Sequence, residues 1–280
     1  MTAPGIPFLG TTFQNPVLLA AGTAGFGHEV AGVIDLEALG GIVTKAVTPE
    51  PRRGHPGPRV AEFRGGMLNA VGLANPGLDH AAAADLPWLG RLRRARVIVN
   101  VAGATVDDYA RVVERLAPLE VVAAFELNAS CPNTSAGGIE FGAGAAALAQ
   151  LVRRCRAVTA KPLVAKLSPA VPDVAALARA ARDAGADAVS LVNTMPGELG
   201  GRLGNGFGGM SGPALLPVGV RATRLVRERV GIPVIGVGGI RTAADAREYL
   251  RAGATLVAIG TAALADPRVP ERVARGLLRG

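Results

Sequence analysis

One thiol stands among hydrogen-bonding residues where it could take part in chemistry. Cys131 comes three residues after Asn128, past the end of an apolar run, and precedes the glycine-rich stretch 135–144. A free cysteine at an arbitrary position usually packs as a small apolar side chain. A thiol just past a strand, ahead of a segment that can close over it as a lid, is instead placed for chemistry. We therefore predict that Cys131 is catalytic and that Cys155, within a basic helical stretch, is structural.

Two lysines lie in apolar runs. Lys45 is near the end of the run 41–46, and Lys166 is within the run 163–167. Lysine is rarely buried without a partner, so two lysines on strands indicate an anionic group near the centre of the protein. The alternative is that both ammonium groups reach solvent along the strands. We favour the anionic group.

Amide side chains gather in the same parts of the sequence. Five asparagines follow apolar runs or lie in the long connections between them: Asn69, Asn100, Asn128, Asn133 and Asn193. An amide both donates and accepts hydrogen bonds, which suits a planar ligand with amide groups of its own. Any one of them could be a turn residue, so the prediction depends on the whole set.

Glycines end two further apolar runs. Gly238 and Gly239 follow Val237, and Gly260 precedes Thr261. Backbone N–H groups at such strand ends commonly bind a phosphate, because missing side chains allow close approach. The alternative is that these glycines only turn the chain. The pattern favours a phosphorylated ligand, of which FMN is one candidate.

Short apolar, β-branched runs must position these residues. Each is followed by a longer amphipathic segment, which is typical of repeated βα units. The runs cover residues 17–21, 41–46, 97–101, 124–128, 163–167, 188–192, 234–237 and 256–259. Eight parallel strands in about 250 residues make a (β/α)8 barrel. The 280 residues therefore predict the α/β class, with a single TIM-barrel domain over 1–280.

Helix signals and long connections complete the expected barrel. Thr105 with Asp108 and Thr242 with Asp245 can form capping boxes, and a helix is expected over 174–184. Two long connections rich in Gly, Pro and Asn follow strands, over 47–77 and 194–213. We expect them as extended loops at the carboxyl ends of the strands, where active sites of this fold lie.

The composition limits the classes of partner. The formal charge is +8, but the chain has only seven Phe, two Tyr and one Trp. A nucleic-acid groove needs aromatic residues among its charges, so we expect none. No apolar run approaches the ~18 residues of a membrane span, so we expect no membrane association and a cytoplasmic location. Two cysteines are too few for a cysteine-ligated iron–sulfur cluster, and we predict no metal site in this chain.

A collinear set of motifs makes the sequence similar to the class 1 dihydroorotate dehydrogenases, above all to the catalytic subunit of the NAD-linked class 1B enzymes. The motifs extend over nearly the whole chain and read NPVLLAAGTAGFG, TKAVTPEPRRGHPGPRV, GGMLNAVGLANPGLD, VNVAG, ELNASCPN, GGIEFG, KLSP, VNT, GGMSGPA, PVIGVGGI and AIGTA. Such a set is far more specific than one glycine-rich motif. The resemblance implies FMN-dependent oxidation of (S)-dihydroorotate to orotate, the redox step of pyrimidine synthesis, with one FMN per chain.

The resemblance also implies roles for single residues. Cys131 would be the general base that removes a proton from C5 of the substrate while a hydride leaves C6 for the flavin. Lys45, also counted as catalytic, would face flavin and substrate, and Lys166 would stabilise the charge of the reduced flavin. The implied substrate contacts are Lys45, Asn69, Ala70, Val71, Gly72, Leu73, Asn128, Asn193 and Thr194. The implied flavin contacts are Ala21, Lys45, Ala46, Asn100, Asn128, Lys166, Val192, Gly212, Gly238, Gly239, Gly260 and Thr261, of which the last four would hold the phosphate.

Two departures from the family pattern bear on these roles. Ala21 stands where the family often has a serine near the flavin, so one hydrogen bond is missing or supplied by another group. The segment 195–209 is several residues shorter than in the family and would border the substrate. A related FMN enzyme that acts on another dihydropyrimidine or cyclic amide is therefore an alternative. A barrel that binds a phosphorylated ligand without catalysis is a further alternative, which the thiol and the two lysines disfavour.

The resemblance leaves the partner open. Class 1B enzymes pair with a subunit that carries FAD and a [2Fe-2S] cluster, and those groups would lie only on that partner. Class 1A enzymes are homodimers that use fumarate. We expect a homodimer, with a heterotetramer that includes the FAD and iron–sulfur subunit as the alternative.

Overall fold

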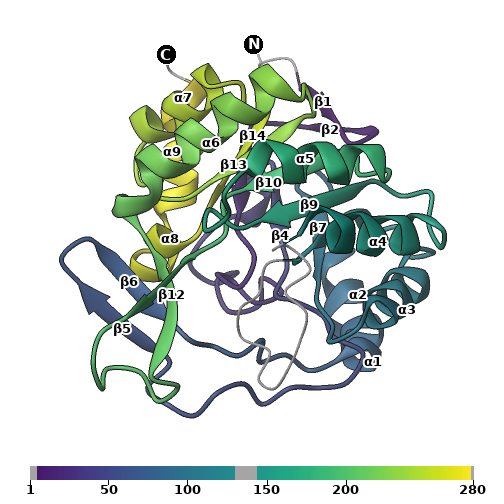
Figure 1. Cartoon of the computed structure of the whole chain (residues 1–280), viewed down its shortest axis with the longest axis horizontal. Helices are drawn as coiled ribbons and strands as arrows, with labels where there is room; N and C mark the ends of the chain where they lie inside the picture. Colours follow the sequence, from purple (N-terminus) through teal and green to yellow (C-terminus); the bar gives the residue numbers. More distant parts are fainter. Residues whose placement is uncertain (1–4, 130–143, 279–280) are drawn as a thin grey trace.

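A closed barrel of eight parallel strands forms the centre of the molecule (Figure 1). The computed structural model describes residues 5–129 and 144–278. In chain order the barrel strands are β3 (Val17–Leu19), β4 (Gly41–Val43), β7 (Arg96–Val101), β8 (Val122–Leu127), β9 (Leu163–Leu167), β10 (Ala188–Leu191), β13 (Val234–Val237) and β14 (Leu256–Ile259). The order around the barrel is β10-β13-β14-β3-β4-β7-β8-β9, so strand neighbours in the sequence are neighbours in space. The predicted (β/α)8 barrel is confirmed.

Two of the predicted strands stop at least two residues before the ends of their apolar runs. β3 stops at Leu19 rather than at residue 21, and β4 stops at Val43 rather than at residue 46. The reason lies in the backbone partners of the next residues. The N–H of Lys45 donates to the carbonyl of Gly25, 2.8 Å away, instead of to a neighbouring barrel strand. Lys45 and Ala46 therefore lie just beyond the barrel wall.

The barrel strands are buried on both faces, and their side chains alternate between two apolar layers. One layer fills the barrel and includes Leu18, Ile98, Val164 and Ile235. The other layer, which includes their sequence neighbours Leu19 and Val97, packs against the helices. This alternation follows from the two-residue period of a strand.

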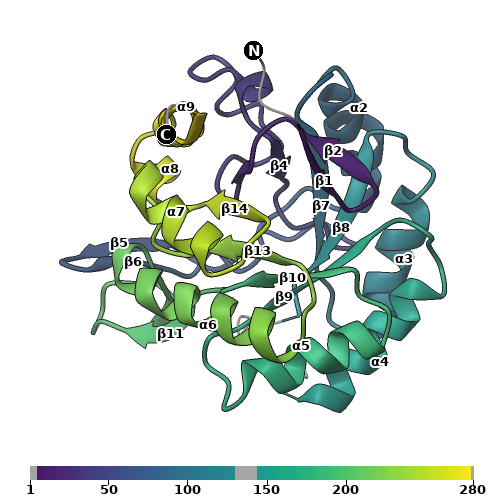
Figure 2. The ribbon, with the colours of Figure 1, turned by 90° about the horizontal axis from the view of Figure 1, so that it is seen from above.

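Six longer helices surround the barrel (Figure 2). They are α3 (Val106–Leu116), α4 (Ala145–Arg156), α5 (Val174–Asp183), α6 (Leu216–Arg229), α7 (Ala243–Arg251) and α9 (Val269–Leu278). Both predicted capping boxes are present, with the Thr105 side chain accepting from the N–H of Asp108 and the Thr242 side chain from the N–H of Asp245. The predicted helix over 174–184 begins after Asp173, whose side chain accepts from two N–H groups of its first turn.

Shorter elements complete the chain. They are the hairpin β1 (Ile6–Phe8) and β2 (Thr11–Phe13), the 3-10 helices η1 (Leu36–Ala38) and η3 (Pro213–Leu215), the π-helix η2 (Ala81–Asp85), and the short helices α1 (Leu78–His80), α2 (Leu86–Leu89) and α8 (Thr261–Ala265). The β1–β2 hairpin contributes Phe8 and Phe13 to the apolar layer inside the barrel. It therefore closes the amino-terminal end of the barrel.

The two long connections extend from the barrel, and each contains a pair of strands. They contain β5 (Val60–Phe63), β6 (Gly66–Asn69), β11 (Met195–Glu198) and β12 (Phe207–Ser211), which pair as a sheet in the order β11-β12-β6-β5. Glycine allows the close pairing, since a Cβ at Gly208 would lie 2.4 Å from the carbonyl oxygen of Asn69. This sheet extends from the barrel at the end opposite to β1 and β2 (Figure 1).

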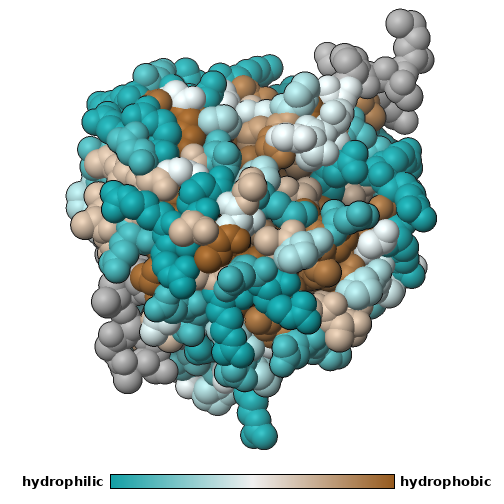
Figure 3. Space-filling model, turned by 90° about the vertical axis from the view of Figure 1, so that its right-hand side faces the viewer, coloured by the Kyte–Doolittle hydropathy of each residue, from teal (hydrophilic) through white to brown (hydrophobic). Residues whose placement is uncertain are grey.

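The outer surface is mixed rather than uniformly charged. On the face shown in Figure 3, hydrophilic side chains alternate with small hydrophobic areas. Several arginines stand in the last turns of helices, as with Arg153, Arg154 and Arg156 on α4, where the helix dipole favours positive charge. In the described ranges, no helix is long and apolar enough to cross a membrane.

Candidate active site

The interior of the barrel changes from apolar to polar toward the carboxyl ends of the strands. Ile98, Ala124, Val164 and Ala188 belong to the apolar layer inside the barrel. The residue two positions farther along each of these strands faces the same interior, because side chains alternate along a strand. These four residues are Asn100, Glu126, Lys166 and Ser190, and all of them are buried. We call them the polar layer.

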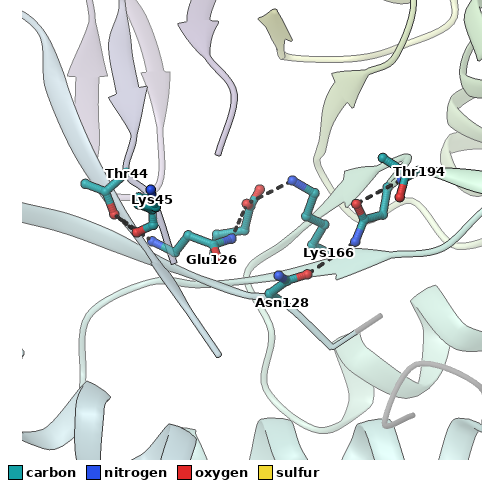
Figure 4. Close-up of polar contacts among 8 residues, drawn as sticks. Thr44, Lys45, Glu126, Asn128, Lys166 and Thr194 are labelled. Carbon is teal, nitrogen blue, oxygen red and sulfur yellow. Dashed lines mark hydrogen bonds and ion pairs between the residues drawn. The ribbon is translucent and has the colours of Figure 1, made fainter. Parts of the chain in front are cut away.

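A carboxylate lies at the centre of the polar layer. Oε1 of Glu126 accepts a hydrogen bond from Nδ2 of Asn100 at 2.7 Å and lies 3.4 Å from Nζ of Lys166 (Figure 4). The sequence predicted an anionic group near the two strand lysines. For Lys166, part of that negative charge comes from the protein itself. Lys45 is half-buried and has no ion pair with another described residue.

Two polar atoms of this layer have no hydrogen-bond partner in the described part of the chain. They are Oδ1 of Asn100 and Oγ of Ser190, and both are buried. A buried polar atom without a partner costs about 1–3 kcal/mol. A ligand with its own donors would offset this cost at the mouth of the barrel.

Asn128, Asn193 and Thr194 form a second polar group at the mouth. Nδ2 of Asn193 donates to Oδ1 of Asn128 at 3.2 Å, and the N–H of Thr194 donates to Oδ1 of Asn193 at 2.9 Å (Figure 4). The hydroxyl of Tyr109 donates to the carbonyl of Asn128 at 2.9 Å. The three side chains are half-buried, so a ligand can contact them.

The segment 70–73 is held by backbone hydrogen bonds to Arg59 and His55 and, at its last residue, by the buried amide of Asn75. Nδ2 of Asn75 donates to the carbonyl of Leu73 at 2.7 Å and to Oγ1 of Thr48 at 2.8 Å, and Oδ1 accepts from the N–H of Gly77 at 2.9 Å. Leu73 adopts a positive φ of 56°, which is strained for a residue with a side chain. Such strain persists only where surrounding contacts hold the backbone, and Asn75 supplies those contacts.

The glycine turn after β13 is held by Tyr249 of α7. Its buried hydroxyl lies 2.9 Å from the carbonyl oxygen of Val237 and 2.8 Å from that of Gly238. Burial raises the pKa of this hydroxyl well above its ordinary value, so it stays protonated as a donor. Gly236 accommodates the ring, because a Cβ there would lie 2.3 Å from it. Tyr249 therefore fixes the turn that leads into Gly239.

The remaining glycine positions come together around the ends of β13 and β14. A Cβ at Gly238 would lie 3.5 Å from Cγ2 of Val192, and a Cβ at Gly212 would lie 3.6 Å from Cγ2 of Thr261. The hydroxyl of Thr261 also lies 2.8 Å from that of Ser211. At Gly260 a Cβ would lie 3.6 Å from the Cβ of Ala20, the residue before Ala21.

The predicted site residues fall into three groups: those that gather at one end of the barrel, those outside the described residues, and the structural cysteine. The structure brings the lysines, most of the asparagines and the glycines to one end of the barrel. Cys131, Asn133 and nearly all of the expected lid over 135–144 lie outside the described residues. Cys155 is buried on α4, and burial raises the pKa of its thiol to about 12, which fits the predicted structural role.

Four residues that build or support the site were not predicted. Glu126 and Ser190 belong to the polar layer, Tyr249 supports the glycine turn, and Asn75 supports the segment 70–73. The two-residue alternation could have found the first two, since Glu126 stands two positions before Asn128 and Ser190 two positions before Val192. No local sequence pattern identifies Tyr249, because it lies on α7 whereas its partners Val237 and Gly238 lie at the end of β13.

Comparisons with known proteins identify the family of the chain. The family model described as dihydroorotate dehydrogenase matches residues 6–279. A dihydroorotate dehydrogenase B (NAD(+)) catalytic subunit from Desulforudis audaxviator is 49% identical, over 97% of this chain and 90% of the relative. One of the same description from Cutibacterium acnes is 47% identical, over 99% of this chain and 92% of the relative. A crystal structure of the Eimeria tenella enzyme in complex with ferulenol superposes with a TM-score of 0.82 at 25% identity, over 98% of this chain and 83% of that one.

Removing the amide of Asn75 tests whether it holds the segment 70–73. Asn75→Ala is expected to lower the free energy of unfolding by about 2 kcal/mol, because it deletes several buried hydrogen bonds. Amide hydrogen exchange in 70–73 should become faster. In Asn205→Ala, which loses one surface hydrogen bond to the carbonyl of Phe207, the loss should stay below about 0.5 kcal/mol. Equal denaturant midpoints for both variants would contradict the anchoring role.

Proposed function

The chain belongs to the dihydroorotate dehydrogenase family, and we propose that it oxidises (S)-dihydroorotate to orotate in pyrimidine synthesis, with FMN as the first electron acceptor. The observation that carries this proposal is the set of groups at one end of the barrel. It combines a polar layer with two partnerless buried atoms, a half-buried lysine and a cluster of glycines. These features suit an enzyme that holds a phosphorylated, amide-bearing cofactor next to a small anionic substrate.

The residues at the mouth fit FMN. Its ring system carries amide-like donors and acceptors, which match the buried acceptor of Asn100 and the hydroxyl of Ser190. Its phosphate suits the closely packed backbone at Gly238, Gly239, Gly260 and Thr261. The remaining proposed contacts are those predicted from the resemblance, at Ala21, Lys45, Ala46, Asn128, Lys166, Val192 and Gly212. When bound, FMN would supply the acceptor for the hydrogen that leaves C6 of the substrate with its electron pair.

The substrate is an anionic cyclic amide, and we propose that a second group of residues binds it. Lys45 has no protein carboxylate as a partner in the described residues, so its positive charge is available to the substrate carboxylate. Asn69, Asn128, Asn193 and Thr194 offer amide and hydroxyl groups to the ring. The segment 70–73, held by Asn75, would cover it.

Cys131 is our candidate for the general base. It stands three positions after Asn128, whose side chain lies at the mouth of the barrel. Its thiolate would take the proton from C5 of the substrate, and together with the loss of the hydride from C6 this leaves the double bond of orotate between C5 and C6. The ordinary thiol pKa of about 8.5 makes a cysteine usable as a base near neutral pH.

We also propose that the chain works with an electron-transfer partner. The relatives are described as NAD(+)-linked catalytic subunits, and such a subunit needs another chain to reach NAD. That partner would carry FAD and a [2Fe-2S] cluster in a heterotetramer. The alternative is a homodimer that passes its electrons directly to fumarate.

Anaerobic addition of dihydroorotate to the purified protein tests the function. We expect a visible spectrum of oxidised flavin that bleaches within seconds, because substrate oxidation delivers two electrons to the cofactor. A flavin band that dihydroorotate leaves unchanged, but another dihydropyrimidine bleaches, would favour the alternative substrate. A protein that takes up no FMN would contradict the proposal.

Replacing the two cysteines separately tests the role of the base. Cys131→Ala is expected to lower kcat by about 10²–10⁴-fold, the usual contribution of general acid–base catalysis. Cys155→Ala is the matched control, because it removes the buried thiol of α4, and its kcat should stay within about twofold. Equal kcat for Cys131→Ala and the unmodified enzyme would show that Cys131 is not the base.

Isolation from the native host tests the partner. We expect a second, cysteine-rich chain that carries FAD and iron to co-purify and to confer reduction of NAD. Size-exclusion chromatography with iron and flavin analysis measures this. A homodimer that is fully active with fumarate would contradict the heterotetramer.

A further inference from the structure

Glu126 is a buried carboxylate whose position no step of the proposed reaction requires. It lies on β8 inside the barrel with 2% of its surface exposed. The inward-facing residue two positions earlier, Ala124, belongs to the apolar layer. Burying an ionised carboxylate is costly unless it is paired and hydrogen-bonded, so its presence beside the mouth needs a reason.

The contacts of Glu126 couple it to Lys166. Both Asn100 and Lys166 approach the same oxygen, Oε1, at 2.7 and 3.4 Å. The longer distance exceeds the 2.7–2.9 Å typical of a charge-assisted hydrogen bond. The Asn100 amide therefore fixes the carboxylate, and the carboxylate acts on Lys166 mainly through its charge.

A buried charge pair of this kind has a consequence for any group bound above it. The positive charge of Lys166 favours negative charge on a neighbouring ligand, and the carboxylate offsets that effect. The net charge of the pair is close to zero. Screening by salt is weak for buried charges, so the compensation operates at ordinary ionic strength.

We infer that Glu126 is a positioning residue that, through Lys166, limits how strongly the barrel mouth stabilises the reduced, anionic flavin. The inference rests on the proposed function, since it needs a flavin beside Lys166. Without this limit, the reduction potential of the flavin would be higher, and the reduced flavin would keep the electrons that the next acceptor must receive.

Sulfite binding to the oxidised holoenzyme measures this effect without turnover. The sulfur lone pair forms a bond to flavin N5 and leaves negative charge on the pyrimidine ring of the flavin, so positive charge nearby tightens the adduct. Glu126→Gln keeps the shape and the acceptor for Asn100 but removes the charge. We expect sulfite to bind at least about tenfold tighter in this variant. The two-electron potential should rise accordingly, by about 30 mV per tenfold change.

Two comparisons separate this role from a merely structural one. Glu271→Gln is the matched control, because Glu271 is also buried and paired with an arginine, Arg275, but lies on α9 outside the barrel. Its sulfite affinity should equal that of the unmodified enzyme. In a Lys166→Met background, Glu126→Gln should change sulfite affinity by less than about twofold, since the charge acts through Lys166.

Each outcome decides the inference. Unchanged sulfite affinity in flavin-loaded Glu126→Gln overturns it, and so does a full effect that persists without Lys166. If Glu126→Gln does not fold, Glu126→Asp replaces it, because the shorter side chain withdraws the carboxylate from Lys166. Partial tightening then supports the inference, and unchanged or weaker binding overturns it. An unmodified protein that binds no flavin overturns the proposed function and this inference with it, whereas the other outcomes leave the proposed function intact.

Discussion

The two-residue alternation of strands in a closed barrel is the constraint on which the site depends. Every second side chain must face an interior that water does not fill, so the lower layer is apolar. Two residues farther along four of the strands, the same alternation directs four polar side chains into the interior near the mouth of the barrel: Asn100, Glu126, Lys166 and Ser190. Because these groups are buried, their charges and hydrogen bonds must be balanced within the layer or by a ligand.

Residues outside the barrel wall make this mouth rigid. Tyr249 reaches from α7 to the carbonyl groups of Val237 and Gly238, and its ring packs against Gly236. Asn75 holds Leu73 in a strained conformation on the opposite connection. Both side chains are buried, and neither was recognisable as part of the site from its own sequence neighbours. A binding site for a flat ligand needs such support, because small displacements of the contacting groups weaken binding and catalysis.

The two lysines at the mouth have different electrostatic surroundings. Lys166 has Glu126 within 3.4 Å, whereas Lys45 has no protein carboxylate at that distance among the described residues. The positive charge of Lys166 is therefore compensated by a protein carboxylate, whereas that of Lys45 is available to a bound anion. This difference agrees with the proposed roles, in which Lys166 contacts only the flavin and Lys45 contacts both the flavin and the anionic substrate. Both lysines lie in apolar runs of the sequence, but only the three-dimensional arrangement distinguishes them: Lys166 lies on β9, and Lys45 lies just beyond β4.

The sequence by itself determined the barrel, since apolar runs, capping residues and chain length are local signals that the packed structure preserves. It also predicted that Lys45, Lys166, the glycines and the asparagines gather at one end of the barrel, and the structure brings those that it describes together there, because strand ends in this fold meet at one face. Tertiary structure alone decided the pairing of β6 with β12, whose partners lie more than a hundred residues apart in the chain and which joins two local hairpins into one sheet. It likewise decided the pairing of Glu126 with Lys166 and the support from Tyr249, because the partners of a buried charge or hydroxyl depend on which strands and helices become neighbours, and no local pattern encodes that.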